Sequence, residues 1–176
     1  MSFAHDTVAS MAAAVELVNS AEAPDTMTDA EQLAEFFDRH GYTGVRTGDA
    51  RELAAVRAQR APMRELLTAD RDTAVTLVNE ILARHRAVPR LVRHDALDYH
   101  VHAVPPDAPL DVRIAVETAM AMIDLIRADE LSRLALCADE TCDGIVLDLS
   151  RNRSRRYCSV ACGNRNAVAA YRARKK

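Results

Sequence analysis

Several kinds of residue are scarce in this chain of 176 residues, and each shortage excludes a class of protein. Trp is absent, aromatic residues make up 4% of the chain, and there are only 5 Gly and 6 Pro. So few glycines and prolines favour long regular elements over loops. The core must then be aliphatic, and the hydrophobic share of 49% is enough to build one. No apolar run approaches the ~18 residues of a membrane-spanning helix, so we expect no membrane partner.

Signals for secretion and for common enzymes are missing as well. Residues 1–19 contain Asp6 and Glu16 but no Lys, no Arg and no small-residue cleavage pattern, so we expect a cytoplasmic protein with reduced thiols. There is no Gly-rich phosphate loop, no Gly-x-Ser-x-Gly and no His-Glu-x-x-His. We therefore do not expect an enzyme, since activity would need residues that only the fold brings together.

The four cysteines form two close pairs. Cys137 and Cys142 are followed, after 15 intervening residues, by Cys158 and Cys162. This is the spacing of a four-thiolate zinc site, in which each pair wraps one side of a tetrahedral ion. Two disulfides or free thiols are the alternative, and a reducing compartment disfavours the disulfides. The sequence therefore predicts a structural Zn²⁺ held by all four cysteines.

Charge is distributed unevenly along the chain. Residues 151–176 hold nine of the 23 Lys and Arg and none of the 26 Asp and Glu, so an acidic body carries a basic tail. The tail can be simply solvated, or some of its arginines can neutralise the formal charge of −2 on a zinc–thiolate cluster. Duplex DNA is the partner that we favour. The predicted DNA-binding residues are Arg151, Arg153, Arg155, Arg156, Arg165, Arg172, Arg174, Lys175 and Lys176.

Hydrophobic periodicity predicts an α+β fold that is mainly helical with a small β-hairpin. Helices are expected over residues 6–20, 29–40, 49–69, 70–87 and 109–135, with a capping box at 28–31 and Val75 among the inward residues of the fourth. Pro62 predicts a kink or break in the third helix. Alternation of period two over 90–94 and 98–104 predicts the hairpin. No Gly or Pro separates the last helix from Cys137, so we expect the zinc module to be docked on that helix end.

Two polar clusters in the body each allow two interpretations. Arg57, Arg60 and Arg64 share one helix face. A solvated face paired with Glu65 and other acids is favoured over an anion-binding wall of a pocket. His94, His100 and His102 can form a metal cluster or, as we favour, simply a polar strand face.

The tail is predicted to fold as a treble-clef-like zinc module. Residues 145–150 and 155–158 are expected to pair as strands, followed by a helix with Cys162 in its first turn. On that helix Arg165, Arg172 and Lys176 form a basic stripe, while Val168 and Tyr171 are expected to pack on the hairpin. Such a helix can present cations to DNA phosphates.

These residues resemble a known family. Cys137-x4-Cys142, Asp148-x-Ser150, Arg155-Arg156-Tyr157-Cys158 and Cys162-Gly163-Asn164-Arg165 are similar to the CGNR zinc finger family. The resemblance implies an N-terminal ABATE domain, here 1–135, a zinc finger over 136–176, and a role as a stress-responsive bacterial transcription regulator. Residues 16–20 resemble the opening pattern of that domain, and residues 60–64 fall where a later helix should. Asn19, Arg60 and Arg64 are therefore the candidate ligand-binding residues.

The leading hypothesis is a zinc-dependent DNA-binding transcription regulator. Its N-terminal domain would sense a small-molecule effector or mediate homodimerisation, and the long helix would carry its state to the finger. The alternative is a zinc-finger protein–protein adaptor that does not bind DNA.

Overall fold

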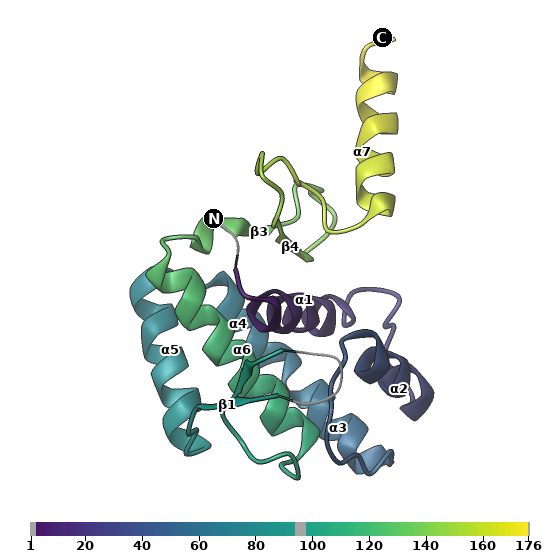
Figure 1. Cartoon of the computed structure of the whole chain (residues 1–176). Helices are drawn as coiled ribbons and strands as arrows, with labels where there is room; N and C mark the ends of the chain where they lie inside the picture. The colour runs from purple at the N-terminus through teal and green to yellow at the C-terminus, as the bar shows by residue number, and fades with distance from the viewer. Residues whose placement is uncertain (1–2, 94–97, 176) are drawn as a thin grey trace.

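The computed structural model describes residues 3–93 and 98–175. A helical body carries a small module at its C-terminal end (Figure 1). The elements are α1 His5–Asn19, α2 Ala30–Arg39, α3 Ala50–Ala58, α4 Arg60–Thr68, α5 Arg71–Arg84, β1 Arg90–Val92, β2 His100–His102, α6 Leu110–Arg127, η1 Leu131–Arg133, β3 Leu134–Leu136, β4 Ile145–Leu147 and α7 Val160–Ala173. The predicted class, mainly helical with small hairpins, is confirmed. In the described ranges no helix is both long and apolar enough to cross a bilayer.

Short polar side chains set where the helices of the body begin. At α3, Asp49 accepts hydrogen bonds from two backbone N–H groups of the first turn, one of them that of Glu52. At α2 the cap is Asp29 rather than Thr28: Asp29 accepts from the backbone N–H of Gln32, whose own side chain accepts from the N–H of Thr28. The capping box was therefore predicted one residue too early.

The predicted third helix is two helices. It breaks at Gln59, the residue between α3 and α4, and Pro62 lies in the first turn of α4. A proline has no N–H and is tolerated in a first turn, where that N–H would have no partner in the helix. The break that Pro62 predicted is thus confirmed.

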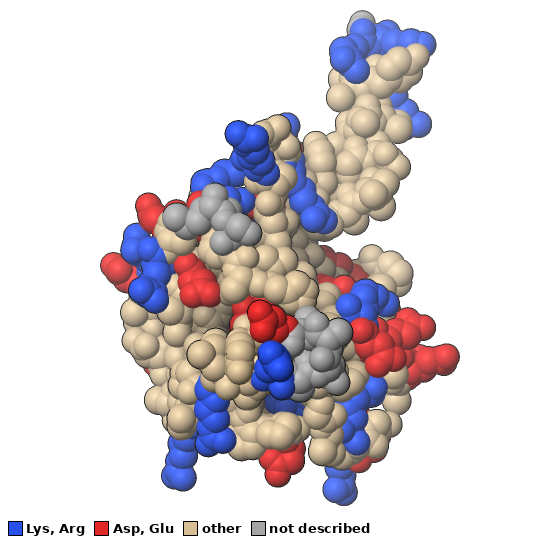
Figure 2. Space-filling model, in the orientation of Figure 1, with Lys and Arg blue, Asp and Glu red and all other residues tan. Residues whose placement is uncertain are grey.

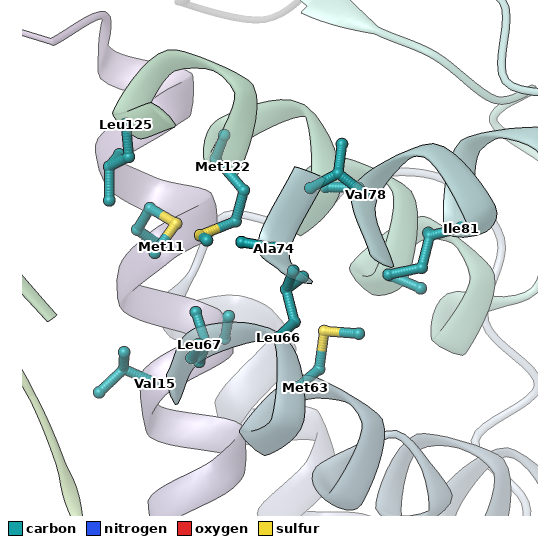
Figure 3. Packing of buried hydrophobic residues seen from close by; sticks show 14 of the residues in the cluster. Met11, Val15, Met63, Leu66, Leu67, Ala74, Val78, Ile81, Met122 and Leu125 are labelled. Atoms are coloured by element: carbon teal, nitrogen blue, oxygen red, sulfur yellow. The ribbon is translucent and has the colours of Figure 1, made fainter. Parts of the chain in front are cut away.

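The core is built around α1, which packs against α4, α6 and β4 (Figure 1). Figure 3 shows Met11 of α1 beside Met122 and Leu125 of α6. α4, α5 and β4 also contribute to this cluster. In α5, Ala74 is fully buried, whereas Val75, predicted to point inward, is 38% exposed. The core is mostly aliphatic, as the scarcity of aromatics predicts, with Phe36 and Tyr42 as its buried aromatic residues.

The last helix of the body ends earlier than predicted. Residues 109–135 were expected to be helical, but α6 stops at Arg127. Asp129 adopts a left-handed conformation (φ 58°), and the backbone N–H groups of Asp129 and Glu130 bond to the carbonyls of Ile126 and Leu125. This is a Schellman motif with Asp in the position that Gly usually takes. The absence of Gly and Pro before Cys137 therefore wrongly predicted a helix that runs up to the zinc module. Instead, the chain continues from α6 into η1 and then β3.

Candidate metal centre

The first cysteine pair lies in the turn of a β-hairpin. β3 pairs antiparallel with β4, with Leu136 opposite Ile145, and beyond that pair the N–H of Cys137 bonds to the carbonyl of Gly144 at 2.8 Å. The predicted pairing of 145–150 with 155–158 is wrong. Residues 155–158 form no strand, because the side chain of Asp148 organises the preceding loop by accepting from the N–H groups of Ser150 and Arg155.

The second pair is held by the start of α7. Ser159 is the N-cap, and its hydroxyl accepts from the backbone N–H of Cys162 at 3.2 Å. Cys158 therefore precedes the helix and Cys162 lies in its first turn, as predicted. The module is thus a knuckle in a hairpin turn, a loop and a helix start; it shares the knuckle and the helix with the predicted treble-clef-like arrangement but not the strand expected over 155–158.

The structure brings all four sulfur atoms together. They lie within 4.8 Å of one another, with the Sγ of Cys158 at 3.5 Å from that of Cys142 and 3.7 Å from that of Cys162. A regular tetrahedron with Zn–S bonds of about 2.3 Å has sulfur atoms about 3.8 Å apart. The cysteines form no disulfide. The donor set and its spacing thus fit one Zn²⁺, and four protein ligands leave no position open for a substrate.

Gly144, between the two cysteine pairs, is also part of this site. A Cβ added there would lie 2.8 Å from the Sγ of Cys158 and 3.2 Å from that of Cys142. Its N–H points at the Sγ of Cys142 at 3.4 Å, and the N–H of Cys158 points at the Sγ of Cys137 at the same distance. These donors offset part of the negative charge that thiolates bring together.

A buried carboxylate and an arginine lie against the sulfur cluster. Asp139 accepts from the hydroxyl of Thr141 at 2.8 Å and from Nε of Arg165 at 2.7 Å. The hydrogen bonds from Thr141, followed by the guanidinium of Arg165, lower the pKa of Asp139 to about 2. Arg165 also donates to the Sγ of Cys162 at 3.3 Å. Arg165 therefore compensates charge within the module, the second of the roles considered for the basic tail.

The thiols show why the cluster needs a cation. Burial and then the neighbouring cysteines raise the pKa of Cys158, and burial raises the pKa of Cys142. Burial also acts on Cys137, but hydrogen bonds led by the backbone N–H of Cys158 outweigh it and lower the pKa of Cys137. Without metal the four sulfurs cannot all ionise at neutral pH, whereas a bound Zn²⁺ stabilises every thiolate.

Asn19 joins the module to the body. Its side-chain amide donates to the carbonyl of Ile145 at 2.8 Å, and its side-chain oxygen accepts from the N–H of Ile145 at 2.7 Å. Asn19, predicted as a ligand-binding residue, thus pairs with the backbone of β4 as a neighbouring strand would. Arg133 and Arg153 add bonds across the same junction, to the carbonyl of Asp148 and to the carboxylate of Glu130.

The three arginines of the third predicted helix are paired with acids of the α1–α2 loop. Asp25 accepts from Arg57 at 2.9 Å and from Arg60 at 2.8 Å, and Arg64 donates to Glu22 at 2.8 Å. The bonds from Arg60 are the largest cause that lowers the pKa of Asp25 to about 2. The pairing with acids that was favoured is present, with Asp25 and Glu22 in place of Glu65. The face is not fully solvated as expected, because the side chain of Arg60 is only 11% exposed.

The histidine pair lies on β2. Nε2 of His100 and Nε2 of His102 are 2.9 Å apart, and His94 lies outside the described residues. Within residues 3–93 and 98–175, the cysteine cluster is the one group of three or more His, Cys, Asp and Glu side chains close enough to share a metal ion. The polar strand face remains the better interpretation of His100 and His102.

The basic residues of the tail fall into two groups. Arg153, Arg155 and Arg165 bond within the chain, Arg155 to the carbonyls of Tyr157 and Cys158. The remaining described ones, Arg151, Arg156, Arg172, Arg174 and Lys175, make no ion pair among the described residues, and Lys176 lies outside those residues. Figure 2 shows the basic end of α7 standing clear of the body.

α7 does not pack as predicted. Val168 and Tyr171 are 48% and 54% exposed instead of packing on the hairpin, and Cys162 is the buried residue of the helix. Figure 1 shows α7 projecting away from both β4 and the helical body. The helix is therefore attached at its first turn, through the sulfur cluster.

Comparison with known families agrees with this geometry. Residues 133–175 match the model described as "CGNR zinc finger", whose cofactor is Zn²⁺, and residues 11–129 match the ABATE model, described as "Putative stress-induced transcription regulator". No curated protein matches the chain. The two matches meet at η1, where the chain passes from the body to the module. The chain belongs to the ABATE family and carries a CGNR zinc finger after its helical body.

Proposed function

We propose that this protein is a zinc-dependent DNA-binding transcription regulator of the cytoplasm. Cys137, Cys142, Cys158 and Cys162 would each supply one ligand to a structural Zn²⁺. The observation that carries the proposal is α7, a helix held at its first turn whose far end is basic and free of the body (Figures 1 and 2). No Asp or Glu follows Asp148 in the sequence, so nothing acidic opposes a phosphate along that helix.

The dimensions of α7 suit the major groove. Its 14 residues span about 21 Å at ~1.5 Å per residue, and the groove of B-DNA, about 12 Å wide, admits one helix. Arg172, Arg174 and Lys175 would contact phosphates, while the exposed Val168 and Tyr171 face the base edges. This assigns a use to the apolar residues that the body leaves uncovered.

The DNA-contacting set is smaller than the sequence predicts. Arg165 is bound to Asp139 and the cluster, and Arg153 and Arg155 bond to their own chain. Their role is to shape the module. The contacts to DNA are proposed for Arg151, Arg156, Arg172, Arg174 and Lys175.

The helical body would be the sensor, and α1 would connect it to the module. The predicted connection was the long helix, but α6 ends at Arg127, whereas Asn19 at the end of α1 bonds to β4. A shift of α1 on ligand binding would therefore change how the module is held.

Binding to a random-sequence duplex, followed by fluorescence anisotropy at rising salt, tests the proposal. Five phosphate contacts predict a slope near −4.5 of log affinity against log salt, a loss of about 500-fold between 50 and 200 mM. Arg172→Ala with Arg174→Ala should reduce the slope by about 2. Arg84→Ala, an exposed arginine on α5, is the matched control. Zinc-loaded protein that ignores DNA at low salt would favour the adaptor function.

A further inference from the structure

A cavity lies in the body, away from the zinc module. Its volume is about 480 Å³, and its walls come from α1, β2, α6 and the loop after α2. Small-molecule sites usually measure about 300–1,000 Å³ and are mostly apolar with a few polar groups. Here Ala9, Val101, Met120 and Ile123 supply apolar wall. Neither Arg60 nor Arg64 lines this cavity.

One polar group in the wall lacks a partner. Tyr42 is 9% exposed, and its hydroxyl makes no hydrogen bond with any described residue. The ring is fixed between neighbours, since it stacks on Phe36 at 6.0 Å and lies 6.1 Å from Phe37. A buried hydroxyl without a partner is costly, and a ligand in the cavity would supply the missing bond.

The charged groups of the wall are mainly acidic. Among the described lining residues are four carboxyl groups, those of Asp6, Asp98, Glu117 and Asp124, one guanidinium, that of Arg127, and four imidazoles, those of His5, His40, His100 and His102. Asp6 accepts from the N–H groups of Thr7 and Val101, and Asp124 accepts from the hydroxyl of Thr7. These neutral donors orient the carboxylates but do not cancel their charge.

Glu117 is a buried carboxyl that no Lys or Arg of the described residues pairs with. Among those residues its basic neighbour is Nδ1 of His102 at 3.7 Å, while the guanidinium of Arg113 donates to the carbonyls of Val45 and Ala108. Burial, to which Asp6 adds and which Arg113 opposes, raises the pKa of Glu117 to about 7. A cation placed beside Glu117 would restore its ionised form.

We propose that this cavity binds a small organic amine, with its ammonium group at Glu117 and Tyr42 and its apolar part against Met120 and Ile123. The inference rests on the proposed sensor role of the helical body. A carboxylate ligand would meet four carboxyl groups, and a neutral one would leave Glu117 with the imidazole of His102 as its basic neighbour. The same α1 lines the cavity near its start and ends at Asn19 on β4, so occupancy can reach the module.

Three probes of one shape and different charge test the site. Calorimetry on the zinc-loaded full chain without DNA compares benzylamine, benzyl alcohol and benzoate. We expect benzylamine to bind about 10-fold or more tightly than benzyl alcohol, and benzoate to bind most weakly. Glu117→Gln should abolish the preference for the amine, while the affinity for benzyl alcohol should stay within about 3-fold of that of the unchanged protein. Glu80→Gln, an exposed acid on α5, should change neither.

The proposal is overturned if benzoate binds best, if folded protein binds none of the probes up to about 10 mM, or if Glu117→Gln keeps the preference. Circular dichroism verifies that each variant is folded. Should Glu117→Gln not fold, Tyr42→Phe serves instead, because its hydroxyl has no protein partner to lose. Tyr42→Phe should weaken the binding of benzylamine about 5-fold. An unchanged affinity would contradict the proposed site. Since DNA is absent, these outcomes are independent of whether α7 binds DNA.

Discussion

The helical body and the zinc module are held together by different forces. The body buries two sets of mostly aliphatic side chains, such as Met11 with Met122 and Leu17 with Leu33. The module's own cluster buries Val146 beside two of its cysteines, Cys137 and Cys162, while Ile145 and Leu147 of β4 pack into the body. Such a small apolar cluster cannot offset the entropy of ordering some forty residues. The metal must therefore take the place of a hydrophobic core in the module. The two regions should accordingly unfold under different conditions.

Removing zinc should give the largest difference in stability between the two regions. Structural zinc contributes about 10–16 kcal/mol of folding free energy in small zinc-finger peptides, so a chelator should unfold residues 134–173 and leave the body folded. Hydrogen exchange measures this, as loss of protection in β3, β4 and α7 beside unchanged protection in α1. Cys142→Ser should reproduce the pattern without chelator. If the amides of the module stayed protected from hydrogen exchange after full metal removal, zinc would not be what holds the module folded.

A substitution in the core of the body should destabilise the body and leave the zinc module intact. Leu66 is 1% exposed in the cluster of Figure 3, so Leu66→Ala should destabilise the body by about 2–5 kcal/mol through lost transfer energy and a cavity. Urea unfolding followed by circular dichroism checks the size. The folded variant should still hold one zinc per chain. If zinc were released as the body unfolds, the module would depend on the folded body.

Acid should weaken the body at a site unrelated to zinc. The folded-state pKa of Asp25, about 2, lies below its ordinary 3.8, so its stabilisation is present above pH 3.8 and is lost as pH falls toward 2. Asp25→Asn should therefore cost about 2 kcal/mol at pH 7 and much less near pH 2. The measurement is the difference in unfolding free energy between the two proteins at both pH values, read from body amides. A difference that is independent of pH would show that its charge is not what holds the α1–α2 loop.

The parts that could be predicted are those set by neighbours in sequence. Cysteine spacing and the break at Pro62 depend on a few adjacent residues, and both agree with the structure. The end of α6 was missed because Asp129 takes a left-handed conformation that is usually reserved for Gly. The 155–158 strand was wrong because one side chain, that of Asp148, reorganises its loop.

Contacts between distant segments could not be predicted at all. The cavity pairs Tyr42, after α2, with Glu117 in α6, and no local pattern marks either residue. Asn19 was singled out through its family pattern, but its partner Ile145 lies 126 residues away. Such roles depend on tertiary packing, which periodicity within one element does not encode.

The junction between the two regions gives the smallest and sharpest test. Asn19→Ala removes both bonds to Ile145, which should cost about 1 kcal/mol net because water can reach the junction and replace part of the loss. If α1 connects sensor and finger, this variant should keep its zinc and its amine binding while the amine no longer alters DNA affinity. Asn79→Ala, an exposed asparagine on α5, should keep that response. A response that survives in Asn19→Ala would place the connection elsewhere, with Arg133 and its bond to the carbonyl of Asp148 as the next candidate.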